Sequence, residues 1–143
     1  MPASSQGDAA SASNLAAHAR TESPAADPHL VADLVTANHI LYDQRVVDAF
    51  GHVSVRHDKR PDRFLLARSM APALVTAADI LEFDLDGNPC DAGGRPVYLE
   101  RFIHGEIYRV RPDVGAIVHS HSHAVIPFGV VRSHKLRAIF HMS

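Results

Sequence analysis

The region from residue 27 to residue 67 shows two different spacings of apolar residues. Between residues 30 and 47 they recur at the helical period, as in a helix that packs on one face. Asp27 and Pro28 suit the start of this helix, because Asp caps free amides and Pro fits the first helical position. We therefore predict a helix from Pro28 to about Gly51. The segment 52–67 predicts a β-hairpin, with strands on either side of a polar turn that contains a proline.

Shorter apolar segments follow, and turn-forming residues separate them. Thr76 and Asp79 have the spacing of a capping box, and Pro112 ends an apolar helical face. The expected elements are one helical turn at 76–79, strands at 80–85, 114–118 and 136–141, and helices at 99–110 and 124–131.

This order of elements predicts an α/β layer structure with a mixed sheet, because the hairpin is antiparallel. Residues 1–26 are rich in Ala and Ser and lack the basic and continuous apolar segments of a targeting signal. We expect them to form a disordered arm, and residues 27–143 to form one domain. The sequence stops just after an expected strand, which suggests a fragment of a longer domain.

Composition narrows the classes of function. The 143 residues carry 14 Lys+Arg against 16 Asp+Glu, and the net charge of −2 predicts no nucleic-acid partner and no anionic membrane surface. No apolar run approaches the ~20 residues of a membrane span. The single cysteine, Cys90, cannot form an internal disulfide. We therefore expect a cytoplasmic protein.

Histidine is unusually frequent, and six of the 11 lie between His104 and His141. The sharpest pattern is His119-x-His121, which directly follows an expected apolar strand. Side chains two apart in a strand point to one face, so both imidazoles can bind one metal ion. Imidazole suits Zn, Mn, Fe or Co. His123 continues the spacing, but it lies beyond the expected strand and is the weaker candidate.

Other polar residues are ambiguous on their own. Glu100 lies in the first turn of the predicted 99–110 helix, where the helix dipole favours any carboxylate. His104 and Glu106, on the same helix, are expected to form ordinary surface pairs.

Two segments resemble the class II aldolase/adducin family. Residues 111–121 read Arg-Pro-Asp-Val-Gly-Ala-Ile-Val-His-Ser-His, with Glu100 and Tyr108 before them, and residues 51–56 read Gly-His-Val-Ser-Val-Arg. The second segment is similar to the family's Gly-Asn-x-Ser-x-Arg loop. The resemblance covers residues 28–143 and implies a three-layer α/β/α fold with a central mixed sheet. It also implies a divalent metal on His119 and His121, Glu100 as acid/base, and a homo-oligomer, commonly a tetramer.

The chain departs from the sugar-phosphate aldolases of that family. His52 replaces the loop asparagine, residues 68–72 contain no glycine, and Tyr98-Leu99 replaces a serine pair before Glu100. A phosphate cradle needs close backbone amides and small hydroxyl residues, and these are missing. The family's third metal histidine also lies downstream, in a segment that this sequence does not contain.

Residues 49–54 resemble instead a branch that decarboxylates hydroxylated aromatic or pyridine carboxylic acids. The expected function is metal-dependent decarboxylation, with Glu100 or His52 delivering the proton. We expect Gly51, Ser54, Arg68 and Ser69 to bind substrate, with the guanidinium of Arg68 holding a second carboxylate. Two alternatives remain open: an aldolase or epimerase acting on a small sugar or sugar phosphate, and a non-catalytic interaction module like the adducin head.

Overall fold

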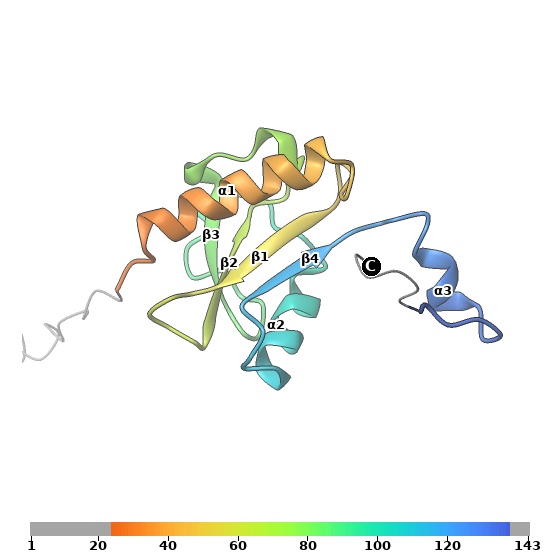
Figure 1. Ribbon diagram of the computed structural model, residues 1–143. Helices are drawn as coiled ribbons and strands as arrows, with labels where there is room; N and C mark the ends of the chain where they lie inside the picture. The colour runs from red at the N-terminus through yellow and green to blue at the C-terminus, as the bar shows by residue number, and fades with distance from the viewer. Residues whose placement is uncertain (1–23, 138–143) are drawn as a thin grey trace, which may run out of the picture.

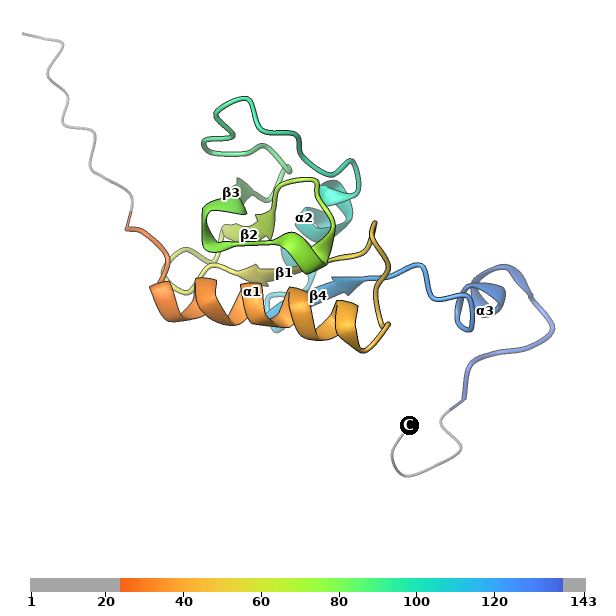
Figure 2. The ribbon, with the colours of Figure 1, turned by 90° about the horizontal axis from the view of Figure 1, so that it is seen from above.

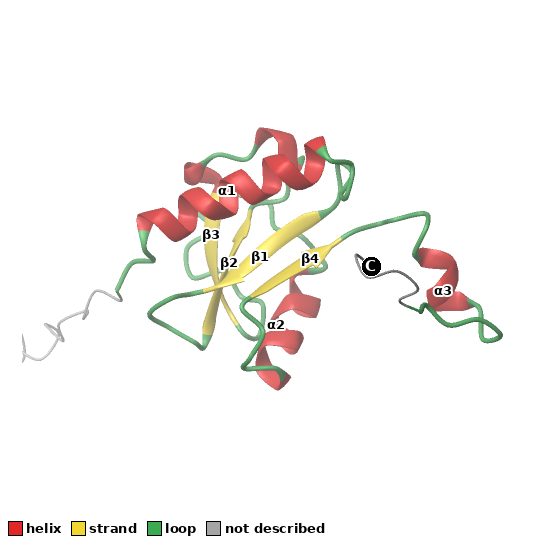
Figure 3. Cartoon of the chain, in the orientation of Figure 1, coloured by secondary structure: helices red, strands yellow, loops and turns green. Residues whose placement is uncertain are grey.

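The computed structural model describes residues 24–137, and its centre is a four-stranded sheet (Figure 1). The helices are α1 (Pro28–Asp43), α2 (Arg101–Val110) and α3 (Ile126–Val130), the strands are β1 (His52–Arg56), β2 (Arg63–Ala67), β3 (Ile80–Asp84) and β4 (Ala116–His119), and two single 3₁₀ turns are η1 (Pro72–Leu74) and η2 (Ala77–Asp79). Figure 3 shows these helices and strands and the loops between them.

Helix α1 begins as predicted and ends earlier than predicted. The Asp27 carboxylate accepts a hydrogen bond of 2.8 Å from the His29 amide and caps the first turn. The predicted end near Gly51 is wrong, because Arg45 adopts a φ of +58° and turns the chain out of the helix. Val47 is still buried, although it lies in the loop. The apolar spacing therefore continued past the helix because one later apolar residue, Val47, is buried from within the loop.

The sheet has the order β3-β2-β1-β4, and every pair within residues 24–137 is antiparallel. The β1–β2 hairpin is confirmed, with Val55 opposite Leu65. The expected parallel component of a mixed sheet is not found among these strands. A parallel pair needs a crossover that returns the chain to the same end of the sheet. Here the connection through α2 brings β4 back antiparallel to β1, with His52 opposite His119.

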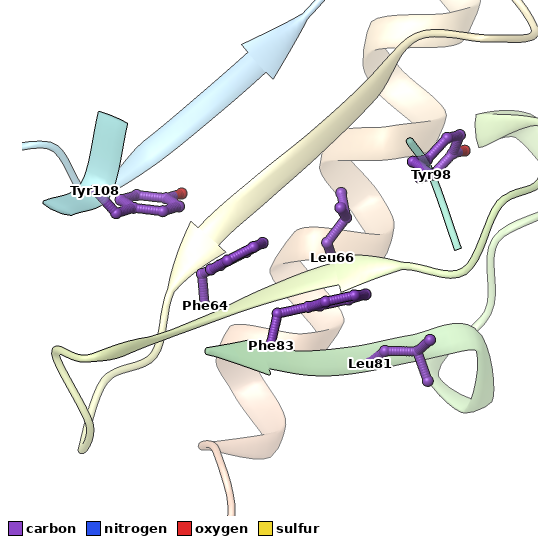
Figure 4. Close-up of a cluster of buried hydrophobic side chains, with 6 residues drawn as sticks. All are labelled: Phe64, Leu66, Leu81, Phe83, Tyr98 and Tyr108. Atoms are coloured by element: carbon purple, nitrogen blue, oxygen red, sulfur yellow. The ribbon is translucent and has the colours of Figure 1, made fainter. Parts of the chain in front are cut away.

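Helices α1 and α2 cover opposite faces of the sheet, which gives three layers (Figures 1 and 2). On the α1 face, Leu34 packs with Val53 and Leu65. On the α2 face lies a larger cluster, which we name the α2 cluster (Figure 4). Its members are Phe64, Leu66, Leu81, Phe83, Tyr98 and Tyr108. Neighbouring β2 residues serve opposite faces, as expected of a strand buried on both sides.

The later elements match the predictions in position more than in length. The capping box at Thr76–Asp79 is confirmed, as is the strand that follows it. The short helix predicted at 124–131 forms over 126–130. The predicted strand over 136–141 is not seen at residues 136 and 137, and its other residues lie outside the described part of the chain.

The Arg56 side chain links the end of β1 to the C-terminal end of α2 through hydrogen bonds. Its guanidinium donates hydrogen bonds to the carbonyls of Tyr108 and Arg111, both at 2.9 Å, and to that of Val114 at 3.1 Å. The carbonyls of Tyr108 and Arg111 lie at the C-terminal end of α2, where a cation is favoured. The arginine of the 51–56 motif therefore sets the position of α2 against the sheet.

The segment after β4 is built differently. Residues 120–137 extend away from the sheet in both views (Figures 1 and 2), and most of their side chains are exposed. No helix within residues 24–137 is long and apolar enough to cross a membrane. The predicted arm, residues 1–26, lies outside the described residues except for its last three, and Ala26 packs against the Leu34 cluster. The domain boundary at residue 27 stays a prediction.

Candidate functional site

His119 and His121 bring their imidazole nitrogens together at the open end of β4. The two Nε2 atoms lie 3.1 Å apart, and both side chains are half-buried. Two nitrogens that share one tetrahedral zinc ion at about 2.0–2.1 Å lie roughly 3.4 Å apart, so the pair fits a shared ion. Within residues 24–137 no third His, Cys, Asp or Glu completes a metal-binding group. The pair would therefore supply two of the three protein ligands that a catalytic zinc site typically has, and its predicted role as a metal pair stays a prediction.

Asp48 supports this pair from the loop after α1. Its carboxylate oxygens lie 3.3 and 3.4 Å from His121 Nδ1, on the opposite side of the ring from the nitrogen that faces His119. It also accepts hydrogen bonds from the amides of Phe50 and Gly51. The bond from Phe50 is the largest influence on the pKa of Asp48, which is lowered. A carboxylate behind a histidine fixes the ring and its tautomer, as outer partners do in metal sites.

Gly51 allows β1 and β4 to meet next to the histidines. A Cβ at this position would lie 2.5 Å from Val47 Cβ and 3.0 Å from the His119 carbonyl oxygen. A side chain there would separate the strand ends. Gly51 therefore holds a packing role, and the substrate-binding role expected for it stays a prediction.

A chain of buried polar side chains runs inward from this point. His52 Nδ1 lies 3.0 Å from His104 Nε2, and His104 Nδ1 lies 2.6 Å from Ser54 Oγ. Ser54 Oγ in turn lies 2.8 Å from the Tyr108 hydroxyl. None of the four is more than 1% exposed. The prediction that His104 forms a surface pair is therefore wrong, because its side of α2 faces the sheet. Glu106 does form one, at 3.5 Å from Arg109 Nε.

Burial determines the protonation states of the two histidines and the tyrosine in this hydrogen-bonded series. It lowers the pKa of His52 to about 3, with the neighbouring His104, His119 and His121 adding to the shift. It also lowers the pKa of His104 to about 4 and raises that of Tyr108 to about 12. An imidazole or phenol removed from water is stable only in its neutral form unless it is paired with a charge. All the contacts are therefore between uncharged groups.

Glu100 lies directly before the first residue of α2, at the N-cap, so the prediction that it lies within the first turn is wrong because the helix begins at Arg101. Its side chain is half-buried. Burial is the main cause of the shifted pKa values of His104 and Tyr98, and the charge of Glu100 raises both. The carboxylate is therefore near the buried chain. Its acid/base role stays a prediction.

The loop that includes Arg68 and Ser69 uses its amides internally. The amides of Arg68 and Ser69 donate to the carbonyls of Asp79 and Pro96, at 2.8 and 2.9 Å. The Met70 amide donates to the Tyr98 hydroxyl at 3.2 Å, and that hydroxyl donates back to the Met70 carbonyl. The Arg68 guanidinium is paired through Nε with Asp79 at 2.7 Å. These contacts leave no row of free amides at residues 68–70.

A cavity of about 570 Å³ opens beside the histidine pair. His121 and His123 form part of its lining, together with the loop after α1. The other lining residues are Tyr42, Asp43, Arg45, Val46, Val47, Asp48, Ala49 and Ser122. His123 is exposed in this wall, and its predicted role as a ligand stays a prediction.

Sequence reasoning missed three residues of this arrangement. His104 and Tyr108 follow Glu100 at intervals of four along α2, and this spacing marks one helical face. The spacing was a usable signal that the face turns inward. Asp48 gave no such signal, because its contact with His121 joins residues 73 positions apart.

Comparison with known proteins agrees with this geometry. The family described as "Class II Aldolase and Adducin N-terminal domain" matches residues 32–143 of this chain. The chain is 39% identical over 122 residues to the decarboxylase tropJ of Talaromyces stipitatus, covering 84% of this chain and 45% of that protein. It is 38% identical over 85 residues to a 3,4-dihydroxyphthalate decarboxylase of Arthrobacter keyseri, covering 53% of this chain and 33% of that one.

A solved structure of an L-fuculose 1-phosphate aldolase from Glaciozyma antarctica has the same fold. The TM-score is 0.62 at 26% identity, covering 74% of this chain and 48% of that one. The chain thus spans less than half the length of each of these three proteins.

Proposed function

Because the chain belongs to the class II aldolase and adducin N-terminal domain family, we propose that the protein is a divalent-metal-dependent carbon–carbon lyase. Its reaction is the non-oxidative decarboxylation of a hydroxylated aromatic or pyridine carboxylic acid. Relatives named as decarboxylases support this choice. The structural observation that carries it is the loop at residues 68–70, whose amides are all bonded to the protein itself. A phosphate group needs such amides as donors, and a carboxylate held by side chains does not.

His119 and His121 would hold the metal ion, with Asp48 fixing the ring of His121. Zinc is the first candidate, and Mn, Co and Fe also suit imidazole ligands. When bound, the ion supplies a Lewis acid that stabilises negative charge on a substrate oxygen.

The residues around the pair then have separate tasks. As the bond to the departing carboxylate breaks, its electron pair stays on the ring carbon and CO₂ leaves. A proton must replace CO₂ on that carbon, and Glu100 or His52 delivers it. Arg68 and Ser69 hold a second carboxylate of the substrate, and Gly51 lets the two strand ends meet beside it. Arg68 Nε is already bonded to Asp79, so the Nη groups would make the contact with this carboxylate. Ser54 is fully buried against His104 and Tyr108, so it acts from behind His104, and the expected direct contact with substrate is corrected.

An aldolase acting on a small sugar phosphate is the second candidate. The fold shared with the L-fuculose 1-phosphate aldolase favours it, because the match rests on 26% identity as well as on shape. In that case, the substrate phosphate would have to bind without the amides of residues 68–70.

The expected setting is a cytoplasmic homo-oligomer. Large apolar side chains of α2, such as Phe102 and Ile103 at 47% exposure each, are open to contact with another subunit. Sedimentation velocity at increasing concentration tests this point, and a monomer at all concentrations would contradict it.

Release of CO₂ is the direct test. The protein is incubated with Mn²⁺, Co²⁺ or Zn²⁺ and with 3,4-dihydroxyphthalate or a pyridine dicarboxylate, and CO₂ is measured. We expect metal-dependent release, and its loss in a variant with both His119→Ala and His121→Ala. Cleavage of L-fuculose 1-phosphate, with no CO₂ from any aromatic acid, would decide for the aldolase.

A further inference from the structure

His52 holds one ring nitrogen whose purpose the fold alone does not explain. Its Nδ1 is bonded to His104, whereas its Nε2 is buried and has no hydrogen-bond partner among residues 24–137. The ring lies between His119, stacked on it at 4.6 Å between centroids, and Tyr98 at 4.2 Å. The unpaired nitrogen therefore belongs to a ring in direct contact with His119, one member of the proposed metal pair.

The direction of the hydrogen bonds decides whether His52 Nε2 carries a hydrogen atom. In the described part of the chain, the Tyr108 hydroxyl has Ser54 Oγ as its one hydrogen-bond partner. If Tyr108 donates to Ser54, then Ser54 donates to His104 Nδ1. His104 then donates from Nε2 to His52 Nδ1, and the proton of His52 must be on Nε2.

The opposite direction is less favourable. The Tyr108 hydroxyl would then accept from Ser54, and its own proton would be buried without an acceptor. His52 Nε2 would also be a buried lone pair without a donor, so two groups instead of one would be unsatisfied. The forward direction leaves only the His52 Nε2–H unpaired.

We propose that Tyr108, Ser54 and His104 fix His52 as a hydrogen-bond donor, and that its Nε2–H binds a carboxylate oxygen of the substrate beside His119 and His121. The carboxylate as ligand class rests on the function proposed above. Tyr108, Ser54 and His104 are positioning residues in this arrangement, and only His52 touches the substrate. A buried donor without a partner is satisfied best by a charged acceptor.

In this arrangement His52 serves as a hydrogen-bond donor to the substrate carboxylate. Proton delivery to carbon is then assigned to Glu100.

Ring ¹⁵N chemical shifts of histidine-labelled protein test the tautomer without metal or substrate. We expect His52 to carry hydrogen on Nε2 and none on Nδ1, with its signals identified from a His52→Asn variant. A proton on Nδ1 would overturn the proposal. Ser54→Ala should release both rings into mixed tautomers, and a His52 signal unchanged in that variant would also overturn it.

Two controls separate this effect from general unfolding. His57 is buried too, but its Nδ1 accepts from the Lys59 amide at 3.1 Å, independently of Ser54. Its tautomer should stay the same in Ser54→Ala. Ser133→Ala removes another serine beside a histidine, 2.9 Å from His134 Nδ1, and should leave His52 unchanged.

Binding of phthalate to the zinc-loaded protein tests the donor itself. We expect His52→Leu to weaken phthalate binding by about 10- to 100-fold, the loss of one hydrogen bond to a charged group. His52→Asn keeps an N–H donor and should bind within about threefold of the original protein. Equal binding by His52→Leu would contradict the proposal. Absence of CO₂ release with these results intact would overturn the reaction proposed above and not the role of His52.

Discussion

His52 and His119 are paired across neighbouring strands, yet they stand at the border of two differently built regions. On the His52 side, each polar group except His52 Nε2 has a partner inside the protein, and the α2 cluster lies next to them. Beyond His119, residues 120–137 contribute no buried residue. The position of His52 is therefore set by the core. That of His121 depends on His119 and on the single carboxylate of Asp48.

This contrast indicates that the two regions contribute different properties to the site. A closed network fixes the direction of a donor, because alternatives leave buried groups unpaired. An open segment leaves room for a ligand, and the 570 Å³ cavity lies on that side.

Removing a ring from the closed region should have the largest effect on stability. Phe64 is 0% exposed and lies 5.5 Å from the Tyr108 ring, so Phe64→Ala leaves a cavity in the α2 cluster. We expect it to lower the free energy of unfolding by about 3–5 kcal/mol. Phe128→Ala, in the open region at 42% exposure, should change it by about 0.5 kcal/mol or less. Urea denaturation measures both, and similar losses would contradict the contrast.

Replacing a glycine with alanine should destabilise the closed region and not the open one. A Cβ on Gly105 would lie 2.4 Å from the Leu85 carbonyl oxygen, where α2 touches the loop after β3. We expect Gly105→Ala to cost about 1–3 kcal/mol, since backbone must move. Gly129 in α3 meets no described atom within 4 Å, so Gly129→Ala should be neutral or stabilising. Thermal unfolding of both variants measures this, and a tolerated Gly105→Ala would mean that α2 packs less closely.

The contribution of the Asp48 carboxylate to the open region can be tested by measuring zinc affinity. We expect Asp48→Asn to weaken zinc binding by about 10- to 100-fold, because the ring of His121 loses its anionic partner. Isothermal titration with Zn²⁺ measures the change, and Asp91→Asn, an exposed carboxylate in the loop after β3, is the matched control. Equal affinities of the two variants would show that Asp48 does not act on the metal pair.

Low pH should reduce the free energy of unfolding through protonation of Asp79. Hydrogen bonds from Thr76 and Arg68 lower its pKa from 3.8 to about 2. Because the folded pKa lies below the unfolded one, the stabilisation is complete above pH 3.8 and is lost as the pH falls towards 2. We expect Asp79→Asn to remove this part of the pH dependence, by about 1 kcal/mol or less. Urea denaturation between pH 2 and 5 measures it, and an unchanged pH profile would contradict the assignment.

Local patterns predicted most of the elements because their causes are local. The Asp27–Pro28 start, the Thr76–Asp79 capping box and the hairpin each depend on residues within a few positions of one another. The end of α1 was the exception. In the loop after α1, Val47 is buried whereas Val46 is 46% exposed, and apolar period alone does not separate such a loop from a longer helix.

The site was predictable to the extent that its residues lie in short motifs. The His119-x-His121 spacing predicted two imidazoles on one face, and the two nitrogens do converge, although β4 ends at His119 and His121 lies two residues beyond it. Its hydrogen-bond partners come from elsewhere in the chain. Ser54 meets His104 across 50 positions, and Asp48 meets His121 across 73.

The sequence by itself determined which side chains are available: two histidines two residues apart, a third where the related loop has asparagine, and a glutamate before a helix. Only the tertiary structure decided that His52 is enclosed with His104, Ser54 and Tyr108, and that His121 remains half-open beside Asp48. The physical reason is that the free energy of a polar group depends on its surroundings. Those surroundings form when α2 and β4 pack on β1, which no spacing along the chain describes.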